Sequence, residues 1–429
     1  MRRLFVIGSV SMAFTTAVAC ASSEEVASSN EVEPSGSIPD ASVREVAVGA
    51  DATEDARAPL CNADGWCETV LPDPNLVLVD VWPLEDRAFA IAESYSSGIK
   101  VLEWTSTDST WRYIDDNSQN EEKVAAELAT TIWSPNADEV YYAVAPGTIF
   151  HGRRPVAPAT AWTWTSRKLA DNNPSKVGLT QLGRNRLTLG VWGTDGSDVY
   201  AWFSNTIFRK SGEGDAIEWL PEYVADDFDA PDEQLFITGL TKRKGGELSF
   251  AGARHRANKS CGFVGRKTAD GYRRIADGVL PEAWGPCIAR ADVPLVFGDL
   301  WPRQLHSLAG DRLLALTESS QVRLLAPADG GHAILAAPIP MLNDVAPNWR
   351  SMWVASDDRQ WLLGHPHSGR RYAAVVWFER VWEAGAPYQI SSIAQNGAPI
   401  DRAPNAIRGT STSNIWVVGD DYAFHKATP

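Results

Sequence analysis

A repeated sequence pattern constrains this 429-residue chain more than any other feature. Three copies are clear: IWSPNADEVYYAVAPGTIFHGRR from Ile132, VWGTDGSDVYAWFSNTIFRKSG from Val191 and IRGTSTSNIWVVGDDYAFHK from Ile407. Each copy has an apolar pair, a turn rich in Asp, Asn, Ser and Gly, and two β-rich runs separated by a second tight turn. A unit of this length cannot bury its own apolar face, so we expect neighbouring copies to stack.

The repeated unit is β-structured, and its period fits the blade of a propeller. Runs such as DVYAWF, EVYYAV and NIWVVG are rich in β-branched, aromatic and aliphatic residues and are bounded by turn residues, which is typical of strands. We expect four antiparallel strands per copy, with the Trp and Tyr residues in the blade core. One anchor residue per inner strand recurs about every 54 residues, close to the kelch period: Trp82, Trp133, Trp192, Thr238, His306, Trp353 and Arg408.

These anchors predict an all-β chain that forms a single β-propeller, most simply of seven blades, although six to eight are compatible with the pattern. The last copy ends at HKATP without a fourth strand, whereas GWCETVLP precedes the first copy as a lone strand. We therefore expect residues 66–71 to pair with the last blade near Phe424. This closure would leave only short, protected sheet edges.

The first 60 residues are predicted to lie outside the propeller, which would occupy residues 61–429. Residues 1–20 carry two arginines, Arg2 and Arg3, directly after the first residue and continue with an apolar stretch, which is typical of an export signal. Small residues before Cys20 resemble the lipobox of bacterial lipoproteins, which implies cleavage there and lipidation of Cys20; cleavage of an ordinary signal after Ala19 is the alternative. Residues 21–60 are acidic and contain no aromatic residue, so we expect a disordered tether.

The cysteines support an oxidising compartment. Besides Cys20, the chain contains two pairs, Cys61 with Cys67 and Cys261 with Cys287. In an exported protein we expect each pair to form a disulfide, with free buried thiols as the alternative. Neither pair has the CxxC spacing of a zinc or redox site, so their predicted role is structural.

The repeats VWGTDGSDVYAW and IRGTSTSNIWVVG are similar to the VWG…(D/N)VWAVG repeats of lipoproteins that are abundant in myxobacteria. The resemblance covers most of the chain from Val81 and is strong in three copies. It implies a β-propeller on an exported lipoprotein and carries no particular activity. Ala21, and not the aspartate that commonly retains lipoproteins in the inner membrane, follows Cys20, which favours the outer membrane of the bacterial envelope.

Catalytic signatures are missing from the sequence: it contains no GxSxG, no P-loop and no HExxH. The closest histidine pair, His365 and His367, flanks a proline and fits a surface turn, so no metal or cofactor is expected. Our first hypothesis is a non-catalytic scaffold that binds an envelope protein or a glycan. The alternatives are a polysaccharide hydrolase or lyase of propeller fold, which convergent carboxylates at the channel mouth would favour, and a purely structural envelope protein.

The charge distribution suggests one candidate binding surface. The formal net charge of −15 argues against nucleic acid as a partner. Residues 242–274 nevertheless carry ten bases, directly after an acidic stretch at 213–233. We expect a patch for an acidic protein or an anionic glycan, or else an acidic segment that folds over the basic blade and neutralises it. The predicted patch consists of Lys242, Arg243, Lys244, Arg254, Arg256, Lys259, Arg266 and Lys267.

Overall fold

The computed structural model describes residues 61–121, 128–174, 188–243, 245–282, 285–329, 331–337, 339, 347–366, 373–395 and 398–427. The predicted signal peptide, Cys20 and the predicted tether lie outside these residues. Within the described ranges the helices are two 3-10 turns, η1 (Ser118–Asn120) and η2 (Gly214–Ala216), and neither has the length or apolarity to cross a bilayer.

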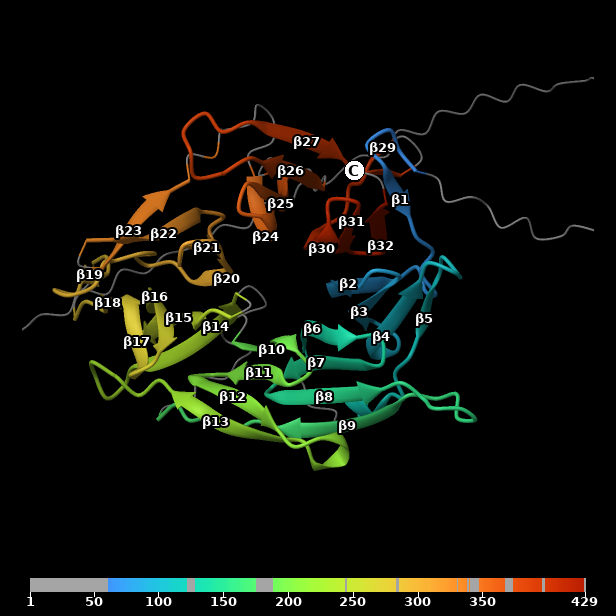
Figure 1. Cartoon of the computed structure of the whole chain (residues 1–429), viewed down its shortest axis with the longest axis horizontal. Helices are drawn as coiled ribbons and strands as arrows, with labels where there is room; N and C mark the ends of the chain where they lie inside the picture. The colour runs from blue at the N-terminus through green and yellow to red at the C-terminus, as the bar shows by residue number, and fades with distance from the viewer. Residues whose placement is uncertain are drawn as a thin grey trace, which may run out of the picture. The chain divides into compact units, whose positions relative to one another are not determined.

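Seven antiparallel sheets of four strands each surround a common centre, as the sequence predicts (Figure 1). In blades 1 to 6 the strands follow one another outward in chain order. Blade 1 contains β2 (Leu76–Pro83), β3 (Arg87–Ser94), β4 (Gly98–Thr105) and β5 (Trp111–Tyr113). Blade 2 contains β6 (Leu128–Asn136), β7 (Glu139–Ala145), β8 (Thr148–Arg153) and β9 (Thr163–Lys168). Blade 3 contains β10 (Leu189–Asp195), β11 (Asp198–Phe203), β12 (Thr206–Ser211) and β13 (Glu218–Val224).

The second half of the ring repeats this arrangement. Blade 4 contains β14 (Gln234–Lys242), β15 (Leu248–Arg256), β16 (Lys259–Thr268) and β17 (Gly271–Ala276). Blade 5 contains β20 (Pro302–Ser307), β21 (Leu313–Thr317), β22 (Val322–Ala328) and β23 (Gly331–Ala336). Blade 6 contains β24 (Pro347–Ser356), β25 (Arg359–Pro366), β26 (Ala374–Phe378) and β27 (Tyr388–Ser392). Two short hairpins lie between blades, β18 (Gly278–Val279) with β19 (Ile288–Ala289) and β28 (Ala394–Gln395) with β29 (Ala398–Pro399).

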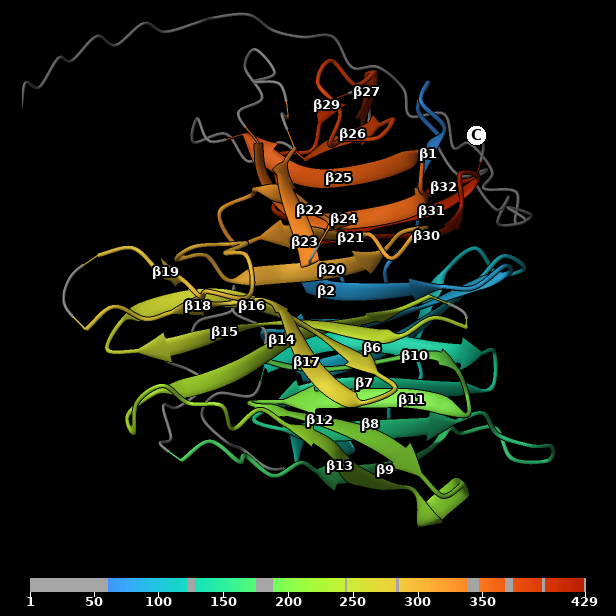
Figure 2. The ribbon, with the colours of Figure 1, turned by 60° about the vertical axis from the view of Figure 1, so that its left-hand side comes forward.

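Blade 7 joins the two ends of the described chain and confirms the predicted closure. It contains β30 (Pro404–Ser411), β31 (Asn414–Gly419), β32 (Tyr422–Lys426) and, as its outer strand, β1 (Trp66–Glu68). β1 pairs antiparallel with β32, so that Glu68 lies opposite Phe424 (Figure 2). Trp66 is fully buried, and its indole N–H donates a hydrogen bond of 2.8 Å to Ser391 Oγ in blade 6. The closing strand is therefore shorter than the predicted 66–71, and it is bonded to β32 of its own blade and to blade 6.

The Trp-Gly pair of the repeat has a packing explanation. A Cβ atom added at Gly193 would lie 2.8 Å from the ring of Trp133, and one at Gly409 would lie 2.6 Å from the ring of Trp353. Both tryptophans are at least nine-tenths buried. The anchor tryptophan of one blade thus lies against the glycine of the next, which confirms these tryptophans as core residues between blades.

Most inner strands also carry a β-bulge at the same position, three residues before the anchor. The register of the pairing shifts there in β2, β6, β14, β20, β24 and β30. In blades 5 and 6 the bulged residues are Arg303 and Arg350, which precede the anchors His306 and Trp353. In blade 4 the bulged residue is Thr238 itself. The predicted anchor of blade 4 was therefore wrong by three residues, because the structurally equivalent position is Thr241.

Candidate binding site in the central channel

A cavity of about 1080 Å³ lies where the seven inner strands meet. Ligand pockets are commonly about 300–1,000 Å³, so this cavity has room for a drug-sized molecule or a short segment of a larger partner. At the carboxyl ends of the inner strands its lining includes three tryptophans, Trp82, Trp192 and Trp353, with Lys242 and Arg243. Large aromatic rings beside cationic side chains are common at binding surfaces.

A belt of seven equivalent residues faces this cavity, one from each inner strand at the level of the bulges. β-Bulges re-aim side chains, which explains why the bulged residues point into the channel. The belt consists of Val79, Thr130, Leu189, Thr238, Arg303, Arg350 and Asn405. Two of these seven are charged, and both are arginines from adjacent blades. Because blades 5 and 6 lie across the ring from blades 1 to 3, the belt has a cationic side that faces the uncharged side chains of Val79, Thr130 and Leu189.

Arg303 has little within the protein to balance its charge. Its Nη1 donates a hydrogen bond of 3.3 Å to the backbone oxygen of Arg350. No carboxylate of the described residues lies within ion-pair distance of its guanidinium. Burial, reinforced by the charge of Arg350 and only partly offset by Glu318, lowers the pKa of Arg303 to about 10. The group is charged at neutral pH, and a bound anion would stabilise that charge.

A third channel arginine, Arg408, is neutralised locally. Its Nη2 lies 3.4 Å from Asp80 Oδ1 on the neighbouring blade. Burial raises the pKa of Asp80 despite the opposing charge of Arg408. Burial, followed by the charge of Arg408, lowers the pKa of His306 to about 3, so this histidine is neutral at physiological pH. Unlike Arg408, Arg303 therefore carries a charge that no carboxylate of the described residues balances at ion-pair distance.

The residue that follows each bulge ties its blade to the next one. Gln304 Oε1 accepts a hydrogen bond of 2.5 Å from the backbone N–H of Met352. Ser351 Oγ accepts one of 3.1 Å from the N–H of Ile407. Thr131 in blade 2 and Asp80 in blade 1 occupy the same position and accept bonds from the next inner strand in the same way. Neighbouring blades are thus held together by these residues and also by members of the belt, since Arg303 donates to the backbone oxygen of Arg350 and Asn405 to that of Leu78.

The carboxylates that line the cavity are engaged in similar structural bonds. Glu93 Oε1 accepts a hydrogen bond of 3.0 Å from the N–H of Ala129 in the adjacent blade. Asp420 Oδ1 accepts one of 3.2 Å from Asn405 Nδ2. Asp80 has the interblade bond and the ion pair described above. Each acid therefore has a structural role that accounts for its position without a catalytic one.

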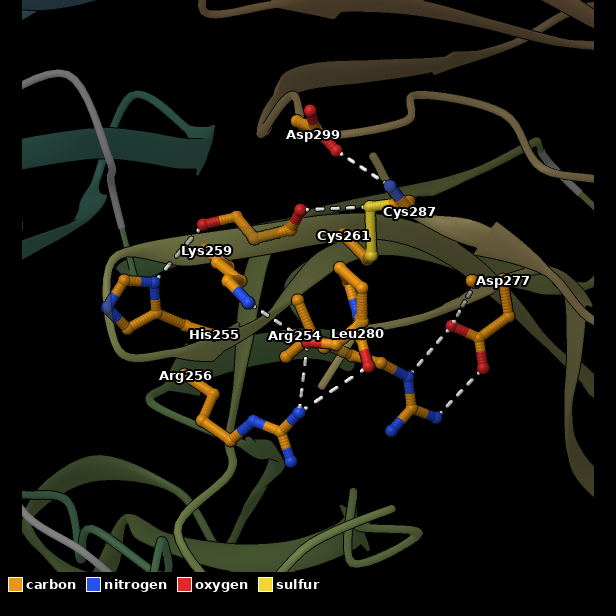
Figure 3. Close-up of a disulfide and its surroundings, with 12 residues drawn as sticks. Arg254, His255, Arg256, Lys259, Cys261, Asp277, Leu280, Cys287 and Asp299 are labelled. Atoms are coloured by element: carbon orange, nitrogen blue, oxygen red, sulfur yellow. Dashed lines mark hydrogen bonds and ion pairs between the residues drawn. A yellow bond between two sulfur atoms is a disulfide. The ribbon is translucent and has the colours of Figure 1, made fainter. Parts of the chain in front are cut away.

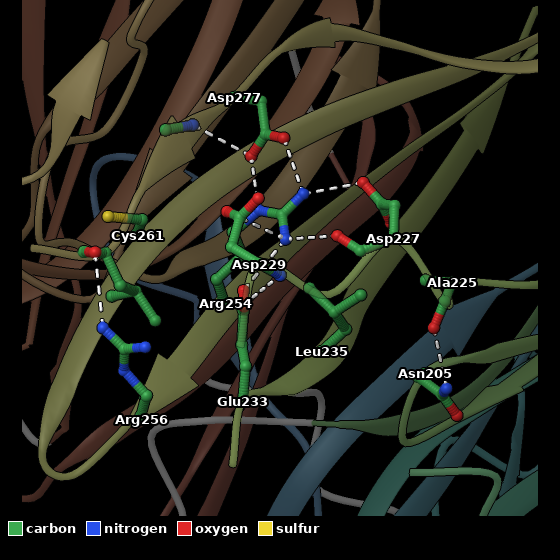
Figure 4. A network of polar contacts seen from close by, with 12 residues as sticks. Asn205, Ala225, Asp227, Asp229, Glu233, Leu235, Arg254, Arg256, Cys261 and Asp277 are labelled. Carbon is green, nitrogen blue, oxygen red and sulfur yellow. Dashed lines mark hydrogen bonds and ion pairs between the residues drawn. The ribbon is translucent and has the colours of Figure 1, made fainter. Parts of the chain in front are cut away.

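Several side chains of the predicted basic patch are buried or paired within the protein, and Arg254 shows this most clearly (Figure 4). Its side chain is fully buried. Its guanidinium binds both oxygens of Asp277 at 2.8 and 2.9 Å, Glu233 at 2.9 Å and Asp227 at 2.6 Å. Arg254 was therefore wrongly assigned to a surface patch, because the acidic segment folds over it as the alternative reading anticipated.

Three further members of the predicted patch are also tied to the protein. Arg266 is buried and donates to Ser249 Oγ at 3.2 Å and to a backbone oxygen of the next blade. Lys267 lies 2.5 Å from Glu222, and Lys242 lies 2.7 Å from Asp198. These side chains balance charges within and between blades.

The remaining members do not form one surface. Arg243 is 57% exposed and lies 3.9 Å from the nearest carboxylate, at the channel mouth. Arg256 and Lys259 donate to the backbone oxygen of Pro281 on another side of the blade. Lys244 lies outside the described residues.

Both predicted disulfides are present, Cys61–Cys67 and Cys261–Cys287. The second ties β16 to the segment that contains the β18–β19 hairpin, and the backbone N–H of Cys287 donates to Asp299 at 2.9 Å (Figure 3). Within the described residues, no three His, Cys, Asp or Glu side chains are grouped to hold a metal ion.

The two belt arginines were missed by sequence reasoning, which searched for charge along the chain. Arg303 stands three residues before His306, and Arg350 stands three residues before Trp353. Alignment of the repeats on their anchors would have placed the two arginines in the same column.

No protein-family model and no curated protein sequence matches the chain. Among solved structures, "YCF48 bound to D1 peptide" is similar with a TM-score of 0.51 and 11% identity, over 86% of this chain and 98% of that one. A streptogramin B lyase has a TM-score of 0.50 and 11% identity, over 84% and 96%. The β-propeller domain of Cps50 (Swd1) from Myceliophteria thermophila has a TM-score of 0.50 and 9% identity, over 84% and 100%. Likeness at such low identity shows that the chain shares the propeller fold with these proteins.

Proposed function

We propose that this propeller is a non-catalytic binding scaffold of the bacterial envelope, held there through a lipid on Cys20, and that its central cavity receives part of an envelope protein or anionic glycan. The observation that carries the proposal is the cavity of about 1080 Å³, lined by all seven inner strands and cationic on one side. The chain as a whole has a net charge of −15, so positive charge inside this cavity favours the binding of an anionic partner and is not explained by the stability of the fold.

The channel residues favour binding over the two alternative functions. A glycosidase uses two carboxyl groups at a defined separation, whereas Asp80, Glu93 and Asp420 each hold neighbouring strands together. A purely structural protein has no use for Arg303, whose burial without a carboxylate partner is costly. The propeller fold by itself is compatible with either binding or catalysis, and these side chains are what favour binding.

The test compares the full chain in detergent with two matched variants as baits for envelope extracts. Val79→Trp fills the cavity without altering a charge, whereas Val70→Trp adds the same ring at a position that is 65% exposed. We expect the native chain and Val70→Trp to retain one stoichiometric partner and Val79→Trp to lose it while unfolding at a similar temperature. Equal retention by all three would refute the cavity as the binding site, and release of sugar fragments from envelope polysaccharide would refute the non-catalytic function.

The envelope anchor is tested separately. Cys20→Ser should move the protein from the membrane fraction to the soluble exported fraction without changing its unfolding temperature. An unchanged membrane fraction would argue against lipidation of Cys20.

A further inference from the structure

We infer that Arg303 and Thr238 form a carboxylate-binding subsite of the cavity, and that the carboxylate belongs to a ligand rich in hydroxyl groups, a sugar acid of an anionic glycan. This inference rests on the proposed function and chooses between the two partner classes that it names. Thr238 and Arg303 occupy equivalent positions of the belt in blades 4 and 5, and β14 packs directly against β20. The two side chains therefore line the same part of the cavity.

The guanidinium of Arg303 has one edge that the protein does not use. Its Nη1 donates to the backbone oxygen of Arg350, and it makes no other hydrogen bond or ion pair with the described residues. This bond leaves Nε and Nη2, whose parallel N–H groups match the two oxygens of a carboxylate in bidentate fashion. The subsite therefore needs only the backbone of Arg350, which orients the fork, and not its side chain.

Two further polar atoms at this side of the cavity can bind a ligand. Thr238 is only 4% exposed, and its Oγ1 has no hydrogen-bond partner in the described part of the chain. His306 Nε2, on the same strand as Arg303, is likewise buried without a partner there. Burial lowers the pKa of His306 to about 3, so the ring is neutral and can form a hydrogen bond with a ligand hydroxyl. Because an unpaired buried polar atom is unfavourable, a ligand that pairs these atoms gains affinity.

The wall across the ring indicates what the carboxylate is attached to. Thr130 Oγ1 donates to the backbone oxygen of Ala143 and can still accept, whereas Thr131 Oγ1 accepts from the N–H of Val191 and can still donate. An aliphatic chain would cover such groups without pairing them, whereas the hydroxyls of a sugar can pair with them. The polar side chains that line this wall are Asp80, Glu93, Ser94, Thr130, Thr131 and Thr188.

Two tryptophans at the channel mouth extend the site. Trp82 and Trp192 are partly buried and line the cavity three residues beyond the belt positions Val79 and Leu189. The faces of such rings pack against the C–H groups of a sugar ring, and the amphipathic indole suits a site that is partly wet. Three residues of a strand span about 10 Å, so a ligand that contacts both levels is longer than one sugar ring. The cavity therefore suits a segment of an acidic glycan.

Isothermal calorimetry with defined probes on the full chain tests this inference. The probes are the disaccharides of galacturonic, glucuronic and mannuronic acid, each with its methyl ester as the uncharged match. We expect at least one acid to bind about tenfold or more tightly than its ester, and more tightly than the corresponding single sugar acid. If no acid is preferred over its ester, water is the only partner of these side chains and the subsite is refuted.

Other anions test the class of ligand. Octanoate, the peptide Ala-Val-Leu with a free carboxyl end and inorganic sulfate should all bind more weakly than the preferred disaccharide. Tighter binding of octanoate or of the peptide would favour an apolar carboxylate and overturn the assignment to a sugar acid. Tighter binding of sulfate would show that the site does not select a carboxylate.

The variants locate the effect. Arg303→Gln should weaken binding of the preferred acid about tenfold or more, and bring it close to that of the ester. Thr238→Val keeps the shape of the side chain without its hydroxyl and should weaken binding about three- to tenfold. Arg273→Gln, at an exposed position of blade 4, should leave binding unchanged. Equal binding by Arg303→Gln and the native chain would overturn the subsite, and thermal unfolding of every variant shows whether a loss of binding reflects a loss of the fold.

Failure here is separable from failure of the proposed function. If Val79→Trp abolishes partner retention while no sugar acid is preferred over its ester, the cavity is the binding site but its ligand is not a sugar acid. If Val79→Trp retains the partner while Arg303→Gln loses the sugar acid, the subsite stands and the cavity is not where the partner binds.

Discussion

Replacement of Arg254 by methionine tests directly whether the basic segment serves the structure of blade 4. The methionine chain is apolar and would leave the surrounding carboxylates without this counter-charge. Asp277 would keep Arg290 at 2.9 Å, and Asp227 would keep Arg274 at 2.7 Å. Glu233, which is 1% exposed, would still accept a hydrogen bond of 2.6 Å from the backbone N–H of Asp229. It would have no ion pair left among the described residues.

These remaining contacts set the expected loss of unfolding free energy in Arg254→Met. Removal of one partner of a buried ion pair costs about 3–5 kcal/mol of unfolding free energy. Asp229, a fourth carboxylate 3.6 Å from Arg254, would keep Arg290 at 2.5 Å. Because three of the four carboxylates keep an arginine, we expect a value near the lower end, about 3 kcal/mol. Adding Glu233→Gln to Arg254→Met removes the remaining isolated charge and should recover about 1–2 kcal/mol.

Urea unfolding of the full chain measures these differences, with Arg256→Met as the matched control. Arg256 is 17% exposed, and its nearest carboxylate, Asp232, lies 3.9 Å away and is 70% exposed, so its loss should cost less than about 1 kcal/mol. If Arg254→Met costs no more than Arg256→Met, the buried network does not stabilise the blade and our reassignment is wrong.

The same network predicts a pH dependence. Burial raises the pKa of Asp227, but the charges of Arg274 and Arg254 outweigh it and hold the pKa below its ordinary value. A carboxyl whose folded pKa is lowered stabilises the fold above its unfolded pKa of about 3.9, and this contribution disappears as the pH falls through the lowered value. The stability difference between the native chain and Arg254→Met should therefore narrow as the pH falls from about 5 towards 3. A difference that widens over this range would contradict the assignment.

Three further predictions use the same unfolding assay. Arg303→Gln should raise the unfolding free energy at pH 7 by about 1–3 kcal/mol, because the fall of the arginine pKa to about 10 marks a destabilised charge; a loss of stability would show that this charge is well balanced. Trp66→Ala should lower the unfolding free energy by about 3–5 kcal/mol, because it removes the fully buried side chain of the closing strand β1; a loss below about 1 kcal/mol would argue against closure by β1. Cys261→Ser with Cys287→Ser opens a bridge across 26 residues and should cost about 3–4 kcal/mol in the chain-entropy account, against which an unchanged stability would count.

The blades, their number and the closing strand were predictable because each depends on a local pattern that recurs. The pairing of β1 with β32 followed from one missing strand and one surplus strand. The anchor of blade 4 was misplaced because this blade has no tryptophan and because the bulge at Thr238 adds a residue that alternation cannot reveal. Arg254 and Arg256 lie two residues apart and face the same side of β15. Arg254 is buried and Arg256 is partly exposed only because residues 225–233 fold over Arg254.

In a propeller, charged residues that are close in sequence and charged residues at equivalent positions of successive repeats have different neighbours. Bases that are close in sequence, as in blade 4, belong to strands of one sheet, where an adjoining acidic segment can fold over them and neutralise them, as Asp227 and Glu233 do for Arg254. Residues at the same position of successive repeats become neighbours around the channel, where they meet one another. Arg303 and Arg350 are one residue each in separate repeats, and neither is conspicuous alone. The charge of Arg303 is not neutralised by its equivalents around the ring, so its counter-charge must come from elsewhere, and in an open channel a ligand can supply it.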